Sequence, residues 1–191
     1  MNFWYQAYHK WFSAEDCQKI IALGKTFKPY EASVILDANK VDTSIRRSTV
    51  RWMSRFEPRC FTLFQTVKAL FEEANSQVFG FDLTHLSEIQ FTEYNADVQG
   101  KYGWHRDLLW VTKNTLVQRK LSMVIQLSKP EDYEGGKLEL DFEEKDIALP
   151  DKMLDQGSVI MFPSFTRHRV TPVTKGIRYS LVSWHSGPPF R

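Results

Sequence analysis

The 191-residue sequence contains only two cysteines, Cys17 and Cys60, and their spacing does not match that of zinc-binding cysteines. We therefore expect free thiols and a reducing compartment rather than a disulfide framework. The chain has no apolar run near the roughly 20 residues needed to cross a bilayer, so no membrane association is expected. Its first residues lack a basic segment followed by an apolar stretch, so a signal peptide is not expected either. These absences favour a cytoplasmic location, or the host cytoplasm if a phage encodes the chain.

A large excess of charge is also missing. There are 25 Lys and Arg residues and 23 Asp and Glu residues, which leaves a formal charge of +2. This balance gives no support to a nucleic-acid partner. No repeat, low-complexity tract or linker is visible, so we expect a single domain over residues 1–191. The aromatic content of 14% is high and fits a β-rich fold.

Residues 1–85 predict helices and a few strands that support a core in the second half. Ser13 is a suitable N-cap for a helix with acidic residues in its first turn, and Gly24 is a suitable end. Apolar residues recur at helical spacing over Pro58–Phe79. The expected strands of this half are Asn2–Tyr8, Tyr30–Leu36 and Thr49–Met53.

From residue 86 onward, short strand patterns alternate with turn signals such as Glu134-Gly-Gly136 and Asp155-Gln-Gly157. The expected strands are Glu88–Tyr94, Gly103–Asp107, Arg119–Leu127, Lys137–Phe142, Asp146–Leu149, Ser158–Phe162, His168–Val170 and Gly176–Trp184. This texture predicts a mainly β fold, an antiparallel jelly roll whose two sheets face each other across a pocket. The N-terminal helices would cover one of these sheets.

The most informative residues are His105, Asp107 and His168. Because strand side chains alternate with period two, His105 and Asp107 would point to the same side. His168, on another strand, would complete two imidazoles and one carboxylate, the ligand set of non-haem Fe(II) oxygenases. Taken alone, a histidine near an aspartate is more often a plain hydrogen-bonded pair. Arg178 lies on the strand after His168 and could hold a carboxylate-bearing co-substrate, with the Ser180 hydroxyl on the same face.

Five stretches of the sequence resemble the Fe(II)- and 2-oxoglutarate-dependent dioxygenases, in their prolyl 4-hydroxylase-like branch. They are Tyr102–Asp107 with Tyr94 before it, Arg119–Ser122, Leu127–Gly136, Gly157–Pro163 and His168–Arg178. Two of these stretches, Leu127–Gly136 and His168–Arg178, are similar to PKHD-type hydroxylases in particular. The resemblance covers about residues 86–185 and implies a double-stranded β-helix catalytic core there.

The resemblance also implies chemistry and residue roles. His105, Asp107 and His168 would bind Fe(II), and Arg178 would bind the 5-carboxylate of 2-oxoglutarate. The co-substrates would be 2-oxoglutarate and O2, with ascorbate as a reductant, and the products succinate, carbon dioxide and a hydroxylated substrate. Gln126 stands where many animal members of the branch carry a tyrosine, and its amide can still donate a hydrogen bond. Tyr94 and Tyr102 are both spaced to reach the pocket, as co-substrate contacts or as rim aromatics.

Several further residues carry structural expectations. Trp104 should face away from the iron and into the core, whereas Trp184 shares the face of Arg178 and could line the substrate pocket. The basic residues Arg46, Arg47, Arg51 and Arg55 are expected on a solvated surface, with a closing loop as the alternative. The polar loops 37–47 and 108–118 are candidate substrate lids.

Three functions remain open from the sequence. The first is a hydroxylase of a prolyl or other amino-acid residue in a protein or peptide. The second is a hydroxylase of a free amino acid or another small molecule. A non-catalytic metal-binding jelly roll is the reading from a different class.

Overall fold

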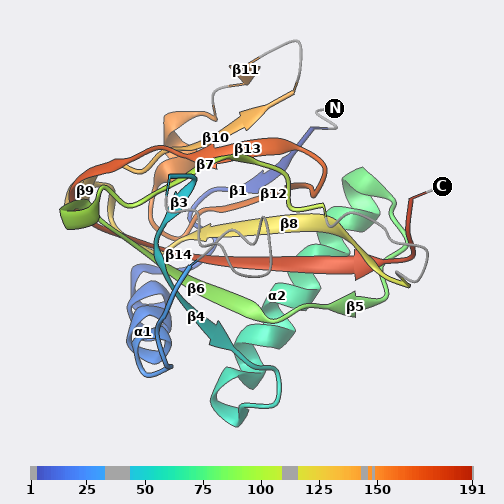
Figure 1. The fold of residues 1–191 in the computed structure, drawn as a ribbon. Coiled ribbons are helices and arrows are strands. Elements are labelled where there is room, and N and C mark those ends of the chain that lie inside the picture. Colours follow the sequence, from blue (N-terminus) through green and yellow to red (C-terminus); the bar gives the residue numbers. More distant parts are fainter. Residues whose placement is uncertain (1–3, 33–43, 109–115, 143–145, 148, 191) are drawn as a thin grey trace.

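The computed structural model describes residues 4–32, 44–108, 116–142, 146–147 and 149–190. In these parts of the chain the strands form two antiparallel sheets, and two α-helices pack on the outer side of the larger one (Figure 1). This arrangement is the predicted jelly roll with flanking N-terminal helices. The parts of the predicted lids at 37–43 and 109–115 lie outside the described residues.

The larger sheet has the strand order β1-β12-β8-β14-β6-β4-β2, and β5 and β9 both pair with β14. Its strands are β1 (Gln6–Tyr8), β2 (Tyr30–Glu31), β4 (Thr49–Met53), β5 (His85–Leu86), β6 (Ile89–Asn95), β8 (Gln118–Gln126), β9 (Tyr133–Gly135), β12 (Val159–Pro163) and β14 (Val173–Gly187). The smaller sheet has the order β11-β10-β13-β7-β3. Its strands are β3 (Arg46–Arg47), β7 (Lys101–His105), β10 (Leu138–Asp141), β11 (Asp146–Ile147) and β13 (Arg167–Val170).

Helix α1 (Ala14–Lys25) begins at a reciprocal cap, in which Ser13 accepts from the Asp16 amide and the Asp16 carboxylate accepts from the Ser13 amide. Helix α2 (Phe61–Ala74) follows a 3-10 turn (Pro58–Cys60) and continues into a π turn (Asn75–Phe79) that ends at Gly80. Both helices bury an apolar stripe against the outer face of the larger sheet. Shorter 3-10 turns cover Ala96–Val98, Pro130–Asp132 and Asp151–Leu154.

Two core clusters lie on opposite faces of the larger sheet. The first joins α1 and α2 to side chains such as Phe91, Leu121 and Leu181. The second lies between the two sheets and contains side chains such as Ile160 and Phe162. Because β-strand side chains alternate, the same strands supply both clusters. Cys17 and Cys60 are buried, unpaired thiols, as the sequence predicts.

Some predicted boundaries are wrong. Gly24 does not end α1 but lies inside it, and a Cβ at this position would stand 2.6 Å from the Phe91 ring. The glycine is therefore required by close helix–sheet packing rather than by a cap. Strand β7 ends at His105, so Asp107 follows the strand instead of belonging to it. Of the predicted strand Tyr30–Leu36, only Tyr30–Glu31 is a strand in the described chain, and residues 33–36 lie outside it.

Candidate metal and co-substrate site

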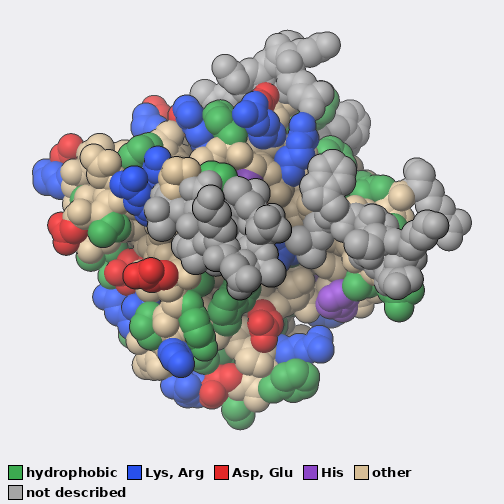
Figure 2. Space-filling model, in the orientation of Figure 1, with side chains coloured by type: hydrophobic (Ala, Val, Ile, Leu, Met, Phe, Trp, Pro, Cys, Tyr) green, Lys and Arg blue, Asp and Glu red, His purple; other side chains and the backbone are tan. Residues whose placement is uncertain are grey.

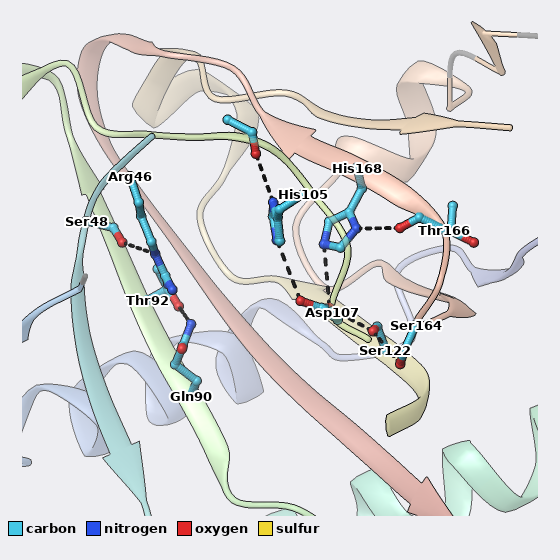
Figure 3. A network of polar contacts seen from close by, with 11 residues as sticks. Arg46, Ser48, Gln90, Thr92, His105, Asp107, Ser122, Ser164, Thr166 and His168 are labelled. Carbon is cyan, nitrogen blue, oxygen red and sulfur yellow. Dashed lines mark hydrogen bonds and ion pairs between the residues drawn. The ribbon is translucent and has the colours of Figure 1, made fainter. Parts of the chain in front are cut away.

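The three predicted ligands converge between the sheets. His105 at the end of β7 pairs directly with His168 on β13, and the chain after β7 brings in Asp107 (Figure 3). Nε2 of His105 is 3.6 Å from Oδ1 of Asp107, and Nε2 of His168 is 3.5 Å from Oδ2. The three potential ligand atoms all lie within 4.8 Å of one another. One ion can therefore contact all three.

The outer nitrogens of both imidazoles are fixed by backbone carbonyls. Nδ1 of His105 lies 2.8 Å from the Gly103 oxygen, and Nδ1 of His168 lies 3.0 Å from the Thr166 oxygen. A carbonyl can only accept a hydrogen bond, so each Nδ1 must carry the proton. Both Nε2 lone pairs then face Asp107, which is the tautomer that a metal ligand needs.

The protonation states also suit a cation. Burial lowers the pKa of His168 to about 4, against an ordinary value of 6.5, so this ring is neutral at pH 7. Burial alone would raise the pKa of the Asp107 carboxyl, but the adjacent His168 and His105 outweigh it and lower the pKa. A buried carboxylate between two imidazoles is a donor set for a divalent metal, and its two nitrogens and one oxygen leave coordination positions open, as non-haem Fe(II) requires.

Arg178 lies deep in the same cavity, on β14, and is 1% exposed. Its Nη2 donates to Oε1 of Gln126 at 2.7 Å, and its Nη1 lies 3.5 Å from the Ser180 hydroxyl. Nε of Arg178 and Nε2 of Gln126 are buried and have no hydrogen-bond partner among the described residues. No described carboxylate forms an ion pair with this guanidinium. A buried cation with unused donors fits an anionic ligand that supplies the missing acceptors.

The surroundings of Arg178 depend on a glycine and an aromatic ring. Gly136 has a φ of +59°, and a Cβ there would stand 2.9 Å from Cδ of Arg178. The predicted Gly135-Gly136 turn therefore leaves room for the arginine. Tyr94, on β6, is buried, and the guanidinium carbon of Arg178 lies 5.5 Å from its ring centre. Gln126, Ser180 and Tyr94 thus all surround Arg178.

Tyr102 lies at a different place. Its ring stacks on His105, with 3.5 Å between ring centres, and the Arg46 guanidinium covers it at 4.4 Å. Burial raises the pKa of the Tyr102 hydroxyl to about 12, so the phenol stays protonated. Tyr102 therefore holds the His105 ring in place from the pocket side.

The cavity between the sheets has a volume of about 350 Å³. Its lining includes the three potential metal ligands and Arg178 with its neighbours. It also includes a second group of residues, of which the sequence analysis expected only Trp184 to line the pocket. This second group consists of Arg46, Trp52, Gln90, Arg119 and Trp184. The expectation that Trp184 lines the pocket is confirmed. Figure 3 shows Arg46, Gln90 and Thr92 beside the three potential metal ligands.

Two expectations about aromatic and basic residues are wrong. Trp104 is half-buried on the outer face of the smaller sheet, where the guanidinium carbons of Arg167 and Arg169 lie 5.1 and 4.6 Å from its ring centre. Figure 2 shows Lys and Arg side chains gathered over these upper strands. Arg46 is 8% exposed and donates through Nε to Ser48, so it is a pocket residue and not part of a solvated surface.

A jelly roll with two imidazoles, one carboxylate and a buried arginine at one pocket defines the class of mononuclear non-haem iron oxygenases. A profile described as the 2OG-Fe(II) oxygenase superfamily matches residues 89–186, about half of the chain. The chain belongs to this superfamily, whose cofactors are Fe(II) and 2-oxoglutarate. The matched residues begin at β6 and end in β14, and they include every potential ligand described above.

The similar curated proteins are PKHD-type hydroxylases. A PKHD-type hydroxylase of Synechococcus sp. (strain JA-2-3B'a(2-13)) is 43% identical over 84 residues, covering 44% of this chain and 36% of that protein. A PKHD-type hydroxylase of Gloeothece citriformis is 37% identical over 123 residues, covering 64% of this chain and 53% of that protein. The matches therefore span about a third to a half of the relatives' length.

Solved structures agree with the fold over nearly the whole chain. A Pseudomonas putida prolyl-4-hydroxylase superposes with a TM-score of 0.74 at 18% identity, covering 98% of this chain and 95% of that one. A prolyl hydroxylase from Trichoplax adhaerens, solved in complex with a hypoxia-inducible-factor peptide fragment, gives 0.74 at 18% identity, covering 96% and 84%. In the described part of this chain, neither helix combines the length and the apolarity needed to span a membrane.

Proposed function

We propose that the chain is a hydroxylase that inserts one oxygen atom into a C–H bond of a prolyl or other amino-acid residue in a protein or peptide. In the balanced reaction, substrate, O2 and 2-oxoglutarate give hydroxylated substrate, succinate and carbon dioxide. Ascorbate is proposed as the reductant that keeps the iron ferrous. One observation supports the proposal most strongly. His105, Asp107 and His168 could hold one metal ion, and they line the same cavity as Arg178, which has no carboxylate partner among the described residues.

Each residue has a separate task in this proposal. His105, Asp107 and His168 would hold the Fe(II), and the ion would supply the activation of O2. Arg178 binds the far carboxylate of 2-oxoglutarate, and the free Nε2 of Gln126 donates to the same group. Ser180 and Tyr94 shape this end of the cavity. Tyr102 orients His105 and is not assigned a direct co-substrate contact.

The assignment to a peptide substrate depends on similarity rather than on the site alone. Two similar solved structures are prolyl hydroxylases, and one of them was solved with a peptide fragment. The alternatives, a hydroxylase of free amino acids and a metal-binding module without activity, share the same metal and Arg178 geometry. They are distinguished by experiment. A cytoplasmic location also remains a prediction.

The test incubates the full chain with Fe(II), ascorbate and 2-oxoglutarate, and follows succinate with prolyl peptides, free amino acids or neither. Peptide-stimulated succinate, together with one added oxygen atom in the peptide by mass spectrometry, supports the proposal. Stimulation by free amino acids alone supports the small-molecule alternative. A protein that binds iron but forms no succinate would be the metal-binding module.

A variant pair links any activity to the site. His168→Ala should abolish succinate formation and weaken iron binding, because one of three ligands is lost. His9→Ala is the matched control. His9 is exposed at the protein surface, where its Nε2 lies 2.8 Å from Oδ2 of Asp155. Equal activity of the two variants would contradict the assignment of His168.

A further inference from the structure

The turn Ser164–Thr166, which joins β12 to β13, lies beside the metal site. The carbonyl of Thr166 is the acceptor 3.0 Å from Nδ1 of His168 (Figure 3). At the other end of the turn, the amide of Ser164 donates to the carbonyl of Lys120 on β8 at 2.9 Å. The turn is thus attached to the larger sheet and orients one of the potential metal ligands.

The same turn also holds the backbone on both sides of Asp107. The carbonyl of Ser164 accepts from the amide of Leu108 at 3.0 Å, and the carbonyl of Phe165 accepts from the guanidinium of Arg106. Strand β7 has already ended at this point, so these two hydrogen bonds take the place of strand pairing. A displacement of the turn would therefore move Asp107 together with the imidazole on β13.

The outer side of the turn is covered by the segment that follows β14. Phe165 is 40% exposed, and its ring lies edge-on to the ring of Phe190, with 5.8 Å between the ring centres. Phe190 also lies edge-on to Phe81, at 5.6 Å. Because edge-on aromatic pairs have a preferred mutual orientation, the position of Phe190 affects that of Phe165 and hence that of the turn.

Phe190 is itself fixed by two residues of β8. Its amide donates to Oε1 of Gln118 at 3.0 Å, and Nζ of Lys120 lies 3.3 Å from the centre of its ring, which is a cation–π contact. Lys120 forms a β-bulge, because the pairing between β8 and β14 skips this residue. Pro188 and Pro189 lie between β14 and Phe190, and each restricts one φ angle. The ring is thus held in one place over the turn.

Burial of apolar surface does not account for this arrangement. Phe190 stays 39% exposed, and neither Phe190 nor Phe165 belongs to a core cluster of the described chain. The loss of either ring should therefore destabilise the fold less than the loss of a core aromatic. What the two rings have in common is the turn that orients the metal ligands.

We propose that Phe190 is a positioning residue for the metal site. By packing on Phe165 it holds the Ser164–Thr166 turn, whose carbonyls set the positions of Asp107 and His168. Phe190 does not line the cavity, so its effect reaches the metal through the turn alone. The inference rests on the metal site of the proposed function and is independent of the substrate.

The test measures metal binding without turnover in the full chain. The affinity for Fe(II) is measured anaerobically by competition with a chelator. The visible absorption of the protein saturated with Co(II) reports the geometry of the ligands around the ion. Urea unfolding of the metal-free protein measures stability separately.

We expect Phe190→Ala to weaken Fe(II) binding about tenfold, at the lower end of the effect that partners of metal ligands have. The Co(II) spectrum should also change, which a role in stability alone would not produce. Phe190→Tyr keeps the ring and should restore both. Trp11→Ala is the matched control, since Trp11 is 46% exposed and packs edge-on against Phe12, and it should leave affinity and spectrum unchanged.

A double-mutant cycle tests whether Phe190 acts through Phe165. Phe165→Ala removes the same contact from the side of the turn and should also weaken Fe(II) binding. If the two rings act together, the double variant should lose little more affinity than Phe165→Ala alone. Losses that multiply in the double variant would overturn the inference.

Two other results would also overturn it. One is an unchanged Fe(II) affinity and Co(II) spectrum in Phe190→Ala or, should that variant not fold, in Phe165→Ala. The other is an equal loss of affinity in Trp11→Ala. If the unaltered protein binds neither Fe(II) nor Co(II), the proposed function fails as well. If it binds both and the variants do so equally, only the role of Phe190 fails.

Discussion

The hydroxyl of Ser122 donates a hydrogen bond of 2.7 Å to Oδ2 of Asp107, the carboxylate oxygen that also faces Nε2 of His168. The same hydroxyl lies 3.0 Å from that of Ser164 (Figure 3). Because Asp107 follows the end of β7, ladder hydrogen bonds do not fix its position. The two serines, on β8 and after β12, fix the carboxylate instead.

This contact predicts that Ser122→Ala weakens iron binding by about 10- to 100-fold, since partners that orient a metal ligand commonly contribute this much. Iron affinity is measured by competition with a chelator. Ser183→Ala is the control, because Ser183 is equally buried but its hydroxyl has no hydrogen-bond partner in the described structure. If the two variants bind iron equally well, Ser122 does not position the ligand.

Gln126→Glu tests the anion site at Arg178. The new carboxylate would replace the amide that lies 2.7 Å from Nη2 of Arg178 and would neutralise the guanidinium from within the protein. We expect the affinity for 2-oxoglutarate to fall on the order of 100-fold, while iron remains bound. Equilibrium dialysis of each ligand measures both. Gln77→Glu, on the exposed π turn, adds the same charge elsewhere and should change neither.

Gly24→Ala should destabilise the fold by about 1–3 kcal/mol, because its Cβ would collide with the buried Phe91 ring. At a solvent-facing helix position the same change stabilises by up to about 1 kcal/mol, so the sign of the effect is informative. Urea unfolding gives the free energy of unfolding. Phe91→Leu in the Gly24→Ala background should recover part of the loss, and strictly additive effects would contradict the proposed collision.

The stability of the metal-free protein should decrease as the pH falls below 6.5. Burial lowers the pKa of His185 from its ordinary value of 6.5, so the unfolded chain takes up this proton before the folded chain does. Stability is therefore full above pH 6.5 and is lost towards the lower folded pKa. His185→Gln should reduce the pH dependence of the urea midpoint between pH 7 and 5, and an unchanged pH dependence would contradict this role of His185.

Much of the fold follows from local sequence patterns. The capping residues of α1, the helical spacing of α2 and the turn glycines all predict elements that the structure contains. The predicted positions of strand ends are less accurate, because a strand ends where its pairing with the neighbouring strand ends. The strands β3, β5 and β9 are short and have no periodic pattern, so they are defined only by pairing with β7 or β14.

The three residues that the sequence predicted as metal ligands do converge in the structure, although part of the argument for them was imperfect. His105 and Asp107 do face the same site, but Asp107 does so from beyond the strand. Alternation shows only that Trp104 points away from the site. The core placement was a further assumption about what covers that face. Whether that outer face is covered by apolar residues or by Arg167 and Arg169 depends on the neighbouring strand.

The sequence by itself determined the residue types that can bind iron and a diacid, and their order along the chain, because ligand chemistry and strand periodicity are local properties. Only the tertiary structure decided the tautomers of His105 and His168 and the direction of Arg119. The tautomers depend on which carbonyl each ring meets, and the direction of Arg119 on a bulge at Lys120. A bulge arises from the register of two paired strands, and one strand's own sequence does not contain that register.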